Sequence, residues 1–246
     1  MSKHFELLQQ IDTDQIVSEP LVPLTSSSKD LSESRSQPAR WATDETLRLV
    51  QKIFLLPTQP VPQAVVFAGV DHGNGSSQIS ASVAEMLSVD TARPVCLVEA
   101  NFRSPGLANL FQVAPTPGLT DSLVHPEPLG TFARAVGQNL WLLTAGTITA
   151  NSASLLSSDR LRERLTELRN TFDFIVIDAP PLSQYSDATM LGKLSDGLVI
   201  VIEADSTRKK VASAVTETLR SLHIPILAAV LNKRTFPIPK AIYKRM

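Results

Sequence analysis

The sequence predicts an α/β fold with a mostly parallel central sheet and helices on both faces, arranged as three α/β/α layers. Apolar runs such as 64–68, 95–99 and 174–178 lack alternating polar positions, which is typical of strands buried on both faces. Segments with helical periodicity separate these runs, and the alternation of strand and helix favours a parallel sheet. In such a sheet, functional residues are expected at the C-terminal ends of the strands.

Each expected element follows from a local pattern, taken here along the chain. Thr43 or Asp44 caps the first helix, and the prolines at 57, 60 and 62 end it. Later helices have apolar residues at a spacing of three or four. The expected helices are 44–54, 76–89, 118–123, 159–168, 187–194 and 207–222, and the expected strands are 64–68, 95–99, 140–144, 174–178, 198–202 and 224–231.

The length and composition indicate one folded domain with flanking segments. A chain of 246 residues with 43% hydrophobic residues can bury a sizeable core. Residues 18–39 are rich in serine and charge and have no apolar period, which is typical of a linker. We expect a flexible N-terminal segment and linker over 1–40, the folded domain over 41–233 and a basic C-terminal tail over 234–246.

The charge and the cysteine content restrict the setting. A net charge of −1 gives no bias toward nucleic acid, so no nucleic-acid partner is expected. The single cysteine, Cys96, lies in an apolar run and excludes an internal disulfide framework, which fits a reducing cytoplasm. The first residues have no long apolar stretch after their charges, so no signal peptide is expected, and there is no apolar run of about 18 residues. We expect a cytoplasmic protein that reaches the inner face of the plasma membrane through a partner.

The segment 64–82, AVVFAGVDHGNGSSQISAS, predicts a phosphate-binding loop. An apolar strand leads into a glycine-rich turn, and a helix begins at Ser76, so that backbone N–H groups can face an anion. The Walker A pattern requires a lysine before the final serine or threonine. Ser76 stands in place of that lysine, and Val70 stands in place of the first glycine. The alternative to a phosphate-binding role for Gly73 and Gly75 is a purely structural one, a tight turn between strand and helix.

Several segments in a fixed order resemble the motifs of one family. VCLVEANFRSP (95–105) is similar to a second Walker-type motif, GLTDSL (118–123) to a Gly-Leu-Ser/Thr-Asp-x-Leu motif, and 172–181 to the strand that contains Walker B. The segments 186–188 and 230–232 match as well. From about Trp41 to Asn232 the chain resembles the cytoplasmic kinase domain of bacterial tyrosine kinases, the CpsD/CapB-like family within the ParA/MinD-type P-loop proteins.

The resemblance implies a P-loop NTPase fold with ATP and Mg²⁺ as cofactors, and a protein-tyrosine kinase or ATPase activity in exopolysaccharide or capsule biosynthesis. It also implies roles for individual residues. The implied catalytic residues are Asp178, Glu99 and Asn101, the implied Mg²⁺ ligands are Ser77 and Asp178, the implied nucleotide contacts are Gly73, Asn74, Gly75, Ser76, Ser77, Gln78 and Asn232, and the implied self-association residues of a homo-oligomer are Glu45 and Arg48.

The departures from the family pattern concern charged groups. Besides the lysine replaced by Ser76, the two aspartates of the second motif are replaced by Glu99 and Asn101, and the last arginine of the self-association segment by Gln51. Serine cannot give a positive charge to the β- and γ-phosphates, and asparagine is neither a base nor a charged metal ligand. These replacements favour weak nucleotide binding, or none, and impaired catalysis.

Three hypotheses follow. The first is a catalytically impaired kinase-like protein that regulates exopolysaccharide or capsule biosynthesis and export. Its partner would be the cytoplasmic tail of a membrane polysaccharide co-polymerase, a chain-length regulator, or an active homologue. The second is a weak autokinase or ATPase, in which Lys193 or Lys233 reaches the loop. The third is a ParA/MinD-like positioning ATPase.

Three of the implied site residues also have a structural alternative. This alternative is a structural or solvated carboxylate for Glu99, capping of a neighbouring loop for Asp178 and termination of a strand for Asn232. Phosphorylation of Tyr243, near the C-terminus, stays open.

Overall fold

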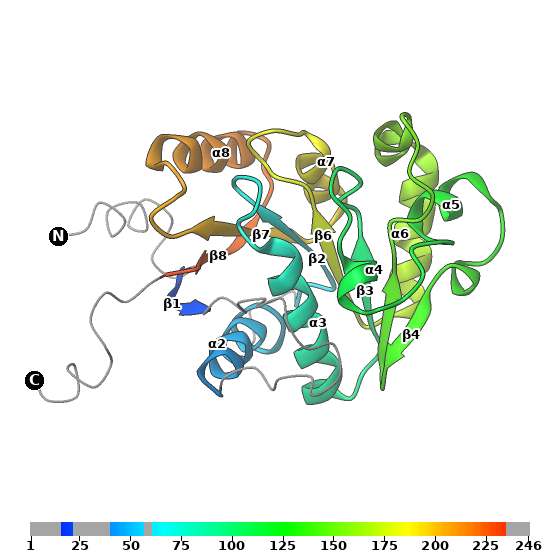
Figure 1. The fold of residues 1–246 in the computed structure, drawn as a ribbon, viewed down its shortest axis with the longest axis horizontal. Helices are drawn as coiled ribbons and strands as arrows, with labels where there is room; N and C mark the ends of the chain where they lie inside the picture. The colour runs from blue at the N-terminus through cyan, green and yellow to red at the C-terminus, as the bar shows by residue number, and fades with distance from the viewer. Residues whose placement is uncertain (1–15, 22–39, 57–60, 235–246) are drawn as a thin grey trace, which may run out of the picture.

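The computed structural model describes residues 16–21, 40–56 and 61–234. They form an eight-stranded sheet in the order β1-β8-β7-β2-β6-β3-β5-β4 (Figure 1). Neighbouring strands are parallel, except that β4 runs antiparallel to β5. The strands are β1 (Ile16–Leu21), β2 (Ala64–Gly69), β3 (Val95–Glu99), β4 (Arg134–Gly137), β5 (Leu140–Leu143), β6 (Phe174–Ala179), β7 (Gly197–Glu203) and β8 (Ile226–Asn232).

Helices cover both faces of this sheet. Their bounds are α2 (Arg40–Val50), continued by a π-helical turn (Gln51–Leu55), α3 (Ser76–Thr91), α4 (Leu107–Leu110), α5 (Leu119–Val124), α6 (Asp159–Thr171), α7 (Asp187–Leu194) and α8 (Lys209–Ser221). Short 3₁₀ turns lie at Leu129–Thr131 and Ser152–Ser157. Figure 1 shows α2 and α3 on one side of the sheet and α6, α7 and α8 on the other.

The core divides into two layers because β2 points alternate side chains to opposite faces. Val65 and Phe67 pack with apolar residues of α2 and α3. Val66 and Ala68 pack with residues of α5, α6, α7 and α8. Every residue of β2 is buried, as the uninterrupted apolar run predicts. The predicted three-layer α/β/α class is therefore confirmed.

Two strands lie where none was predicted. β1 falls partly within the predicted linker and pairs with the outer edge of β8, whereas the rest of that linker lies outside the described residues. Its sequence, IVSEPL, has no apolar run, so pairing along an edge sets this strand rather than local pattern. β4 is a short, half-exposed strand in a hairpin with β5, and a turn residue, Asn139, adopts a φ of 62°.

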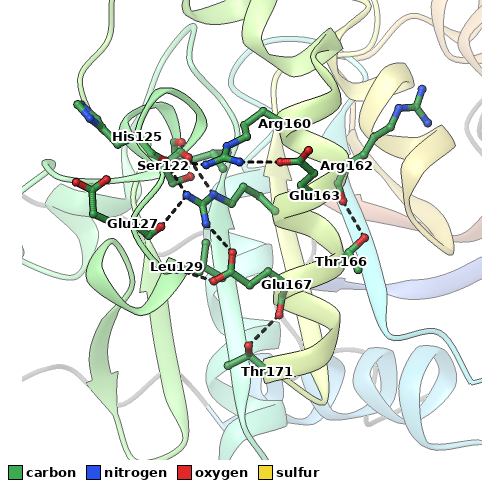
Figure 2. Close-up of polar contacts among 12 residues, drawn as sticks. Ser122, His125, Glu127, Leu129, Arg160, Arg162, Glu163, Thr166, Glu167 and Thr171 are labelled. Atoms are coloured by element: carbon green, nitrogen blue, oxygen red, sulfur yellow. Dashed lines mark hydrogen bonds and ion pairs between the residues drawn. The ribbon is translucent and has the colours of Figure 1, made fainter.

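A buried arginine attaches the segment after α5 to α6. The Arg164 guanidinium donates to the carbonyls of Ser122 at 2.9 Å, His125 at 2.8 Å and Glu127 at 2.7 Å. It also pairs with Glu167 one turn along α6, at 2.6 Å. Figure 2 labels the four partner residues Ser122, His125, Glu127 and Glu167, with these contacts as dashed lines. Since carbonyls and a carboxylate surround the cation, the buried charge is compensated on several sides.

A second polar cluster connects the N-terminal ends of β2 and β7 with α6. The Asp196 carboxylate accepts the N–H groups of Gln63 and Ala64, both at 2.8 Å, and two bonds from Arg169 at 2.7 and 3.0 Å. Burial works against the charged form, but the Arg169 and amide hydrogen bonds outweigh it and hold the pKa of Asp196 below its ordinary value. The carboxylate therefore stabilises the fold when it is ionised.

An Asp196→Asn substitution is expected to lower the free energy of unfolding at pH 7 by about 1–2 kcal/mol, because the cluster is half-exposed and water screens the ion pair. The folded-state pKa lies below the unfolded one, so this stabilisation is present above the unfolded pKa and is lost as the pH falls through the folded pKa. Urea unfolding between pH 2 and pH 7 measures it. Asp90→Asn, at an exposed position of α3, is the control. Equal curves for the two variants would contradict the assignment.

Among the residues that the structure describes, no helix has the length and hydrophobicity needed to cross a membrane.

Candidate functional site

The loop between β2 and α3 has a conformation that glycine permits. Gly73 and Gly75 have φ values of +80° and +86°, in the left-handed region that other residues rarely adopt. Gly75 is also the N-cap of α3, and a Cβ atom on it would collide with the Asn232 side-chain amide. α3 extends over 16 residues, so its N-terminus presents free N–H groups and the positive end of the helix dipole. This is the geometry of a phosphate-binding loop.

The loop is braced from within and from β8. The buried Asn74 side chain accepts the Asp71 N–H at 2.5 Å and donates to Glu203 at 3.3 Å and to Thr207 at 3.4 Å. The Asn232 side chain donates to the Asn74 carbonyl at 2.9 Å. Two of the seven predicted nucleotide contacts, Asn74 and Asn232, therefore bind the backbone of the loop.

The opposite side of the loop is attached to the segment after β6. The Ser183 hydroxyl donates to the Asp71 carboxylate at 2.7 Å. The N–H groups of Leu182 and Ser183 donate to the carbonyls of Gly69 at 2.9 Å and Val70 at 3.0 Å. Contacts from both sides therefore hold the loop in this conformation.

A lysine at the end of β8 also reaches the loop. The Lys233 ammonium group donates to the Gly73 carbonyl at 2.6 Å and lies 3.4 Å from the Glu203 carboxylate. Lys233 was predicted as one of two lysines, with Lys193, that could reach the loop in the second hypothesis. Ser76, at the position of the missing lysine, is the half-buried first residue of α3, and Gln78 is exposed.

The predicted Mg²⁺ ligands, Ser77 and Asp178, lie together. The Ser77 hydroxyl donates to Oδ2 of Asp178 at 2.7 Å. Asp178 is fully buried, and its other oxygen, Oδ1, has no hydrogen-bond partner. Burial raises the pKa of Asp178 to about 8, the Ser77 hydrogen bond opposes the shift, and the negative charge of Glu99 adds to it. An unpaired buried carboxylate oxygen of this kind is an unusual feature that calls for a ligand or a proton.

These residues fit Mg²⁺. A carboxylate and a hydroxyl are the oxygen ligands that the ion prefers, and it keeps several waters or phosphate oxygens besides. Ser77 and Asp178 would hold it, and the ion would neutralise charge on bound phosphates when present. Within the described residues no cluster of three or more His, Cys, Asp or Glu side chains could hold a metal ion, so the phosphates would supply further ligands.

The other two predicted catalytic residues bind backbone groups. Oε1 of Glu99 accepts the N–H groups of Gly106 and Leu107, both at 2.6 Å, and Oε2 accepts that of Ala145 at 3.0 Å. Asn101 is buried and accepts the Ser104 N–H at 3.2 Å, which shapes the turn after β3. Their catalytic roles stay predictions, and these contacts favour the structural alternative.

The predicted self-association residues lie on α2, away from the loop. Arg48 and Glu45 form an ion pair at 3.1 Å, with the arginine side chain 60% exposed. Self-association through these residues stays a prediction. Asp71, Ser183 and Glu203 were missed by sequence analysis. Of these, Glu203 could have been found, because it ends strand β7.

Comparison with known proteins gives the family. No family model matches the chain. It is 30% identical over 171 residues to the tyrosine-protein kinase YwqD of Bacillus subtilis, covering 69% of this chain and 72% of that protein. The chain belongs to the bacterial tyrosine-protein kinases. The predicted resemblance is thereby confirmed. The putative tyrosine-protein kinase CapB of Staphylococcus aureus is 28% identical over 179 residues, which is 72% of this chain and 77% of CapB.

Longer relatives and solved structures agree with this family. The succinoglycan biosynthesis transport protein ExoP of Rhizobium meliloti is 28% identical over 176 residues, which is 70% of this kinase-family chain but 22% of ExoP. The VpsO kinase domain is 29% identical with a TM-score of 0.69, covering 78% of this chain and 98% of that domain. The kinase domain of Escherichia coli ETK shares the fold at 20% identity, with a TM-score of 0.78 and coverage of 97% and 98%.

Proposed function

We propose that this member of the bacterial tyrosine kinases is a catalytically impaired, kinase-like P-loop protein that binds nucleotide phosphates weakly. The observation that carries the proposal is the contrast at the start of α3. Ser77 keeps its hydrogen bond to Asp178 at 2.7 Å, whereas Ser76 occupies the position from which the family's lysine would reach the phosphates. The scaffold for phosphate and Mg²⁺ is retained, and the charge that accelerates transfer is missing.

Impairment follows from the electrostatics of phosphoryl transfer. Positioned charges stabilise the transferred group, and loss of one such donor typically lowers the rate by about 10²–10³-fold. The carboxylate of Glu99 and the amide of Asn101 are engaged by backbone N–H groups, so they do not replace it. Asn101 is also uncharged where the family has an aspartate. Catalysis therefore lacks more than one of its charged groups.

The proposed setting is exopolysaccharide or capsule biosynthesis and export, with a regulatory or binding role. ExoP is by name a succinoglycan biosynthesis transport protein, and 70% of this chain aligns with it. The proposed partner is the cytoplasmic tail of a membrane polysaccharide co-polymerase, or an active homologue. Such a partner would place the protein at the inner face of the plasma membrane.

One observation favours a second candidate, a weakly active ATP-dependent protein-tyrosine autokinase or ATPase. Lys233 brings a positive charge to the loop, 2.6 Å from the Gly73 carbonyl. Calorimetry with MgATP and an assay of ADP formation separate the two candidates. Impairment predicts weak, saturable binding and ADP formation no faster than in an Asp178→Asn variant. Tight binding with ADP formation that this variant abolishes would overturn impairment, and no binding at millimolar nucleotide would overturn the nucleotide-binding role.

A Ser76→Lys substitution is expected to increase MgATP affinity by about tenfold or more, since a hydrogen bond to a charged group contributes about 1.5–3 kcal/mol. The residue begins α3 beside the braced loop, so the new ammonium group has a short path to the phosphates. Titration calorimetry of wild type, Ser76→Lys and Ser76→Met gives the comparison, with methionine as the uncharged control of similar length. Equal affinities in all three would mean that this position does not face bound phosphate.

A further inference from the structure

Lys233 lies at the junction of three elements. It follows the last residue of β8, its ammonium group donates to Gly73 in the loop at 2.6 Å, and it pairs at 3.4 Å with Glu203 at the end of β7. The side chain is 36% exposed, so water or a ligand can reach it. An ammonium group has three N–H donors. Gly73 accepts from one of them, and the Glu203 carboxylate lies 3.4 Å away as an ion-pair partner.

The backbone at Lys233 is held in a conformation that directs this side chain to the loop. Its φ is 56°, in the left-handed region that costs a non-glycine residue about 1–2 kcal/mol. The Asn232 side chain compensates by accepting the Lys233 N–H at 2.9 Å, while its amide donates to the Asn74 carbonyl at 2.9 Å. One asparagine therefore fixes both the loop and the lysine. Backbone strain maintained in this way is typical of functional sites.

We propose that Lys233 supplies the phosphate loop with the positive charge that Ser76 lacks, and that it binds the polyphosphate of a nucleoside di- or triphosphate. The inference rests on the proposed nucleotide-binding function and names the residue that recognises the phosphates. Without ligand, the ammonium group holds the loop through Gly73 and is partly neutralised by Glu203. A polyphosphate carries several negative charges, so it competes with the single carboxylate for the same cation.

The charge of Lys233 reaches the loop from the C-terminal end of β8, whereas the charge of a lysine at position 76 would come from the start of α3. It therefore strengthens binding of the phosphates without restoring the geometry of phosphoryl transfer. Lys233 is accordingly a binding and positioning residue. This accounts for a braced loop and an intact Ser77–Asp178 pair in a chain whose α3 begins with serine.

Calorimetric titration of the full chain with MgATP, magnesium tripolyphosphate and adenosine tests the proposal. Lys233→Met is expected to weaken binding of the first two about ten- to a hundredfold and to leave adenosine binding unchanged, because it removes a charged hydrogen bond to phosphate. Lys233→Arg keeps the charge and should retain most of the affinity. Lys210→Met, at an exposed position of α8, removes the same charge elsewhere and should bind as wild type does.

The double variant Ser76→Lys/Lys233→Met is expected to recover the affinity lost in Lys233→Met, since either position can then supply the cation. Circular dichroism melting confirms that each variant is folded. Equal weakening for adenosine and MgATP would overturn the phosphate role, as would Lys233→Met affinities equal to those of Lys210→Met. If wild type binds none of the ligands, the proposed function fails with this inference. If wild type binds and Lys233→Met binds equally well, only this inference fails.

Discussion

An Asp178→Asn variant is expected to be more stable than wild type at pH 9 and close to it at pH 4. The folded-state pKa of Asp178 is about 8 and its ordinary value is 3.8, so between these values the folded protein binds the proton more tightly than the unfolded chain. The free energy of unfolding of wild type therefore falls as the pH rises through this window, by up to about 1.4 kcal/mol per pH unit, and levels off above it. The amide does not titrate, so the difference between variant and wild type grows with pH.

Urea unfolding without Mg²⁺, from pH 4 to pH 9, measures this difference. The matched control is Asp159→Asn, since the Asp159 side chain is 99% exposed and the charge change is the same. The control should run parallel to wild type at all pH values above about 5. If the Asp178→Asn and wild-type curves are parallel as well, Asp178 does not carry a buried charge in the folded protein, and its unpaired oxygen is satisfied by water.

The second large effect is expected at α6. An Arg164→Met substitution should lower the free energy of unfolding by about 3–5 kcal/mol, because removing one partner leaves buried polar groups uncompensated. The Arg164 side chain is 5% exposed. Its loss leaves three carbonyls and the Glu167 carboxylate without this donor. The Glu167 carboxylate also accepts the Leu129 N–H at 2.7 Å. The segment between α5 and α6 would then lose its attachment. Urea unfolding at pH 7 gives the value.

The neighbouring Arg160 is the natural control for Arg164. It also donates to the His125 carbonyl at 3.2 Å and pairs with Glu163 at 2.7 Å (Figure 2). Its side chain, however, is 36% exposed. Exposed ion pairs contribute about 0–1 kcal/mol, so Arg160→Met should change stability little. Similar losses for the two variants would show that the contacts to the loop carbonyls, and not burial of the cation, determine the effect.

Much of the fold could be predicted from the sequence because local pattern and tertiary position agree. Buried parallel strands appear as apolar runs, and their C-terminal ends identify the site, as Ser77 with Asp178 and Asn232 with the loop show. β1 and β4 could not be predicted in this way. Both lie at edges of the sheet, where pairing with a neighbour rather than an apolar run decides the conformation.

The contacts within the site were harder to predict than its location. Glu99 ends β3 at the predicted place, but its carboxylate reaches the amides of 106–107 and 145. Those amides belong to the start of the short helix α4 and to the segment after β5, whose positions no residue pattern defines. Lys233 depends on a positive φ at a residue that seldom adopts one, which propensity reasoning does not anticipate.

The close approach of Gly75 and Asn232 limits how the phosphate-loop site can change during evolution. A side chain at position 75 would displace the Asn232 amide, and that amide holds both the Asn74 carbonyl and, through its oxygen, the backbone of Lys233. Positions 75 and 232 are therefore not free to vary independently. Among homologous sequences, glycine at 75 and asparagine at 232 should be inherited or lost together.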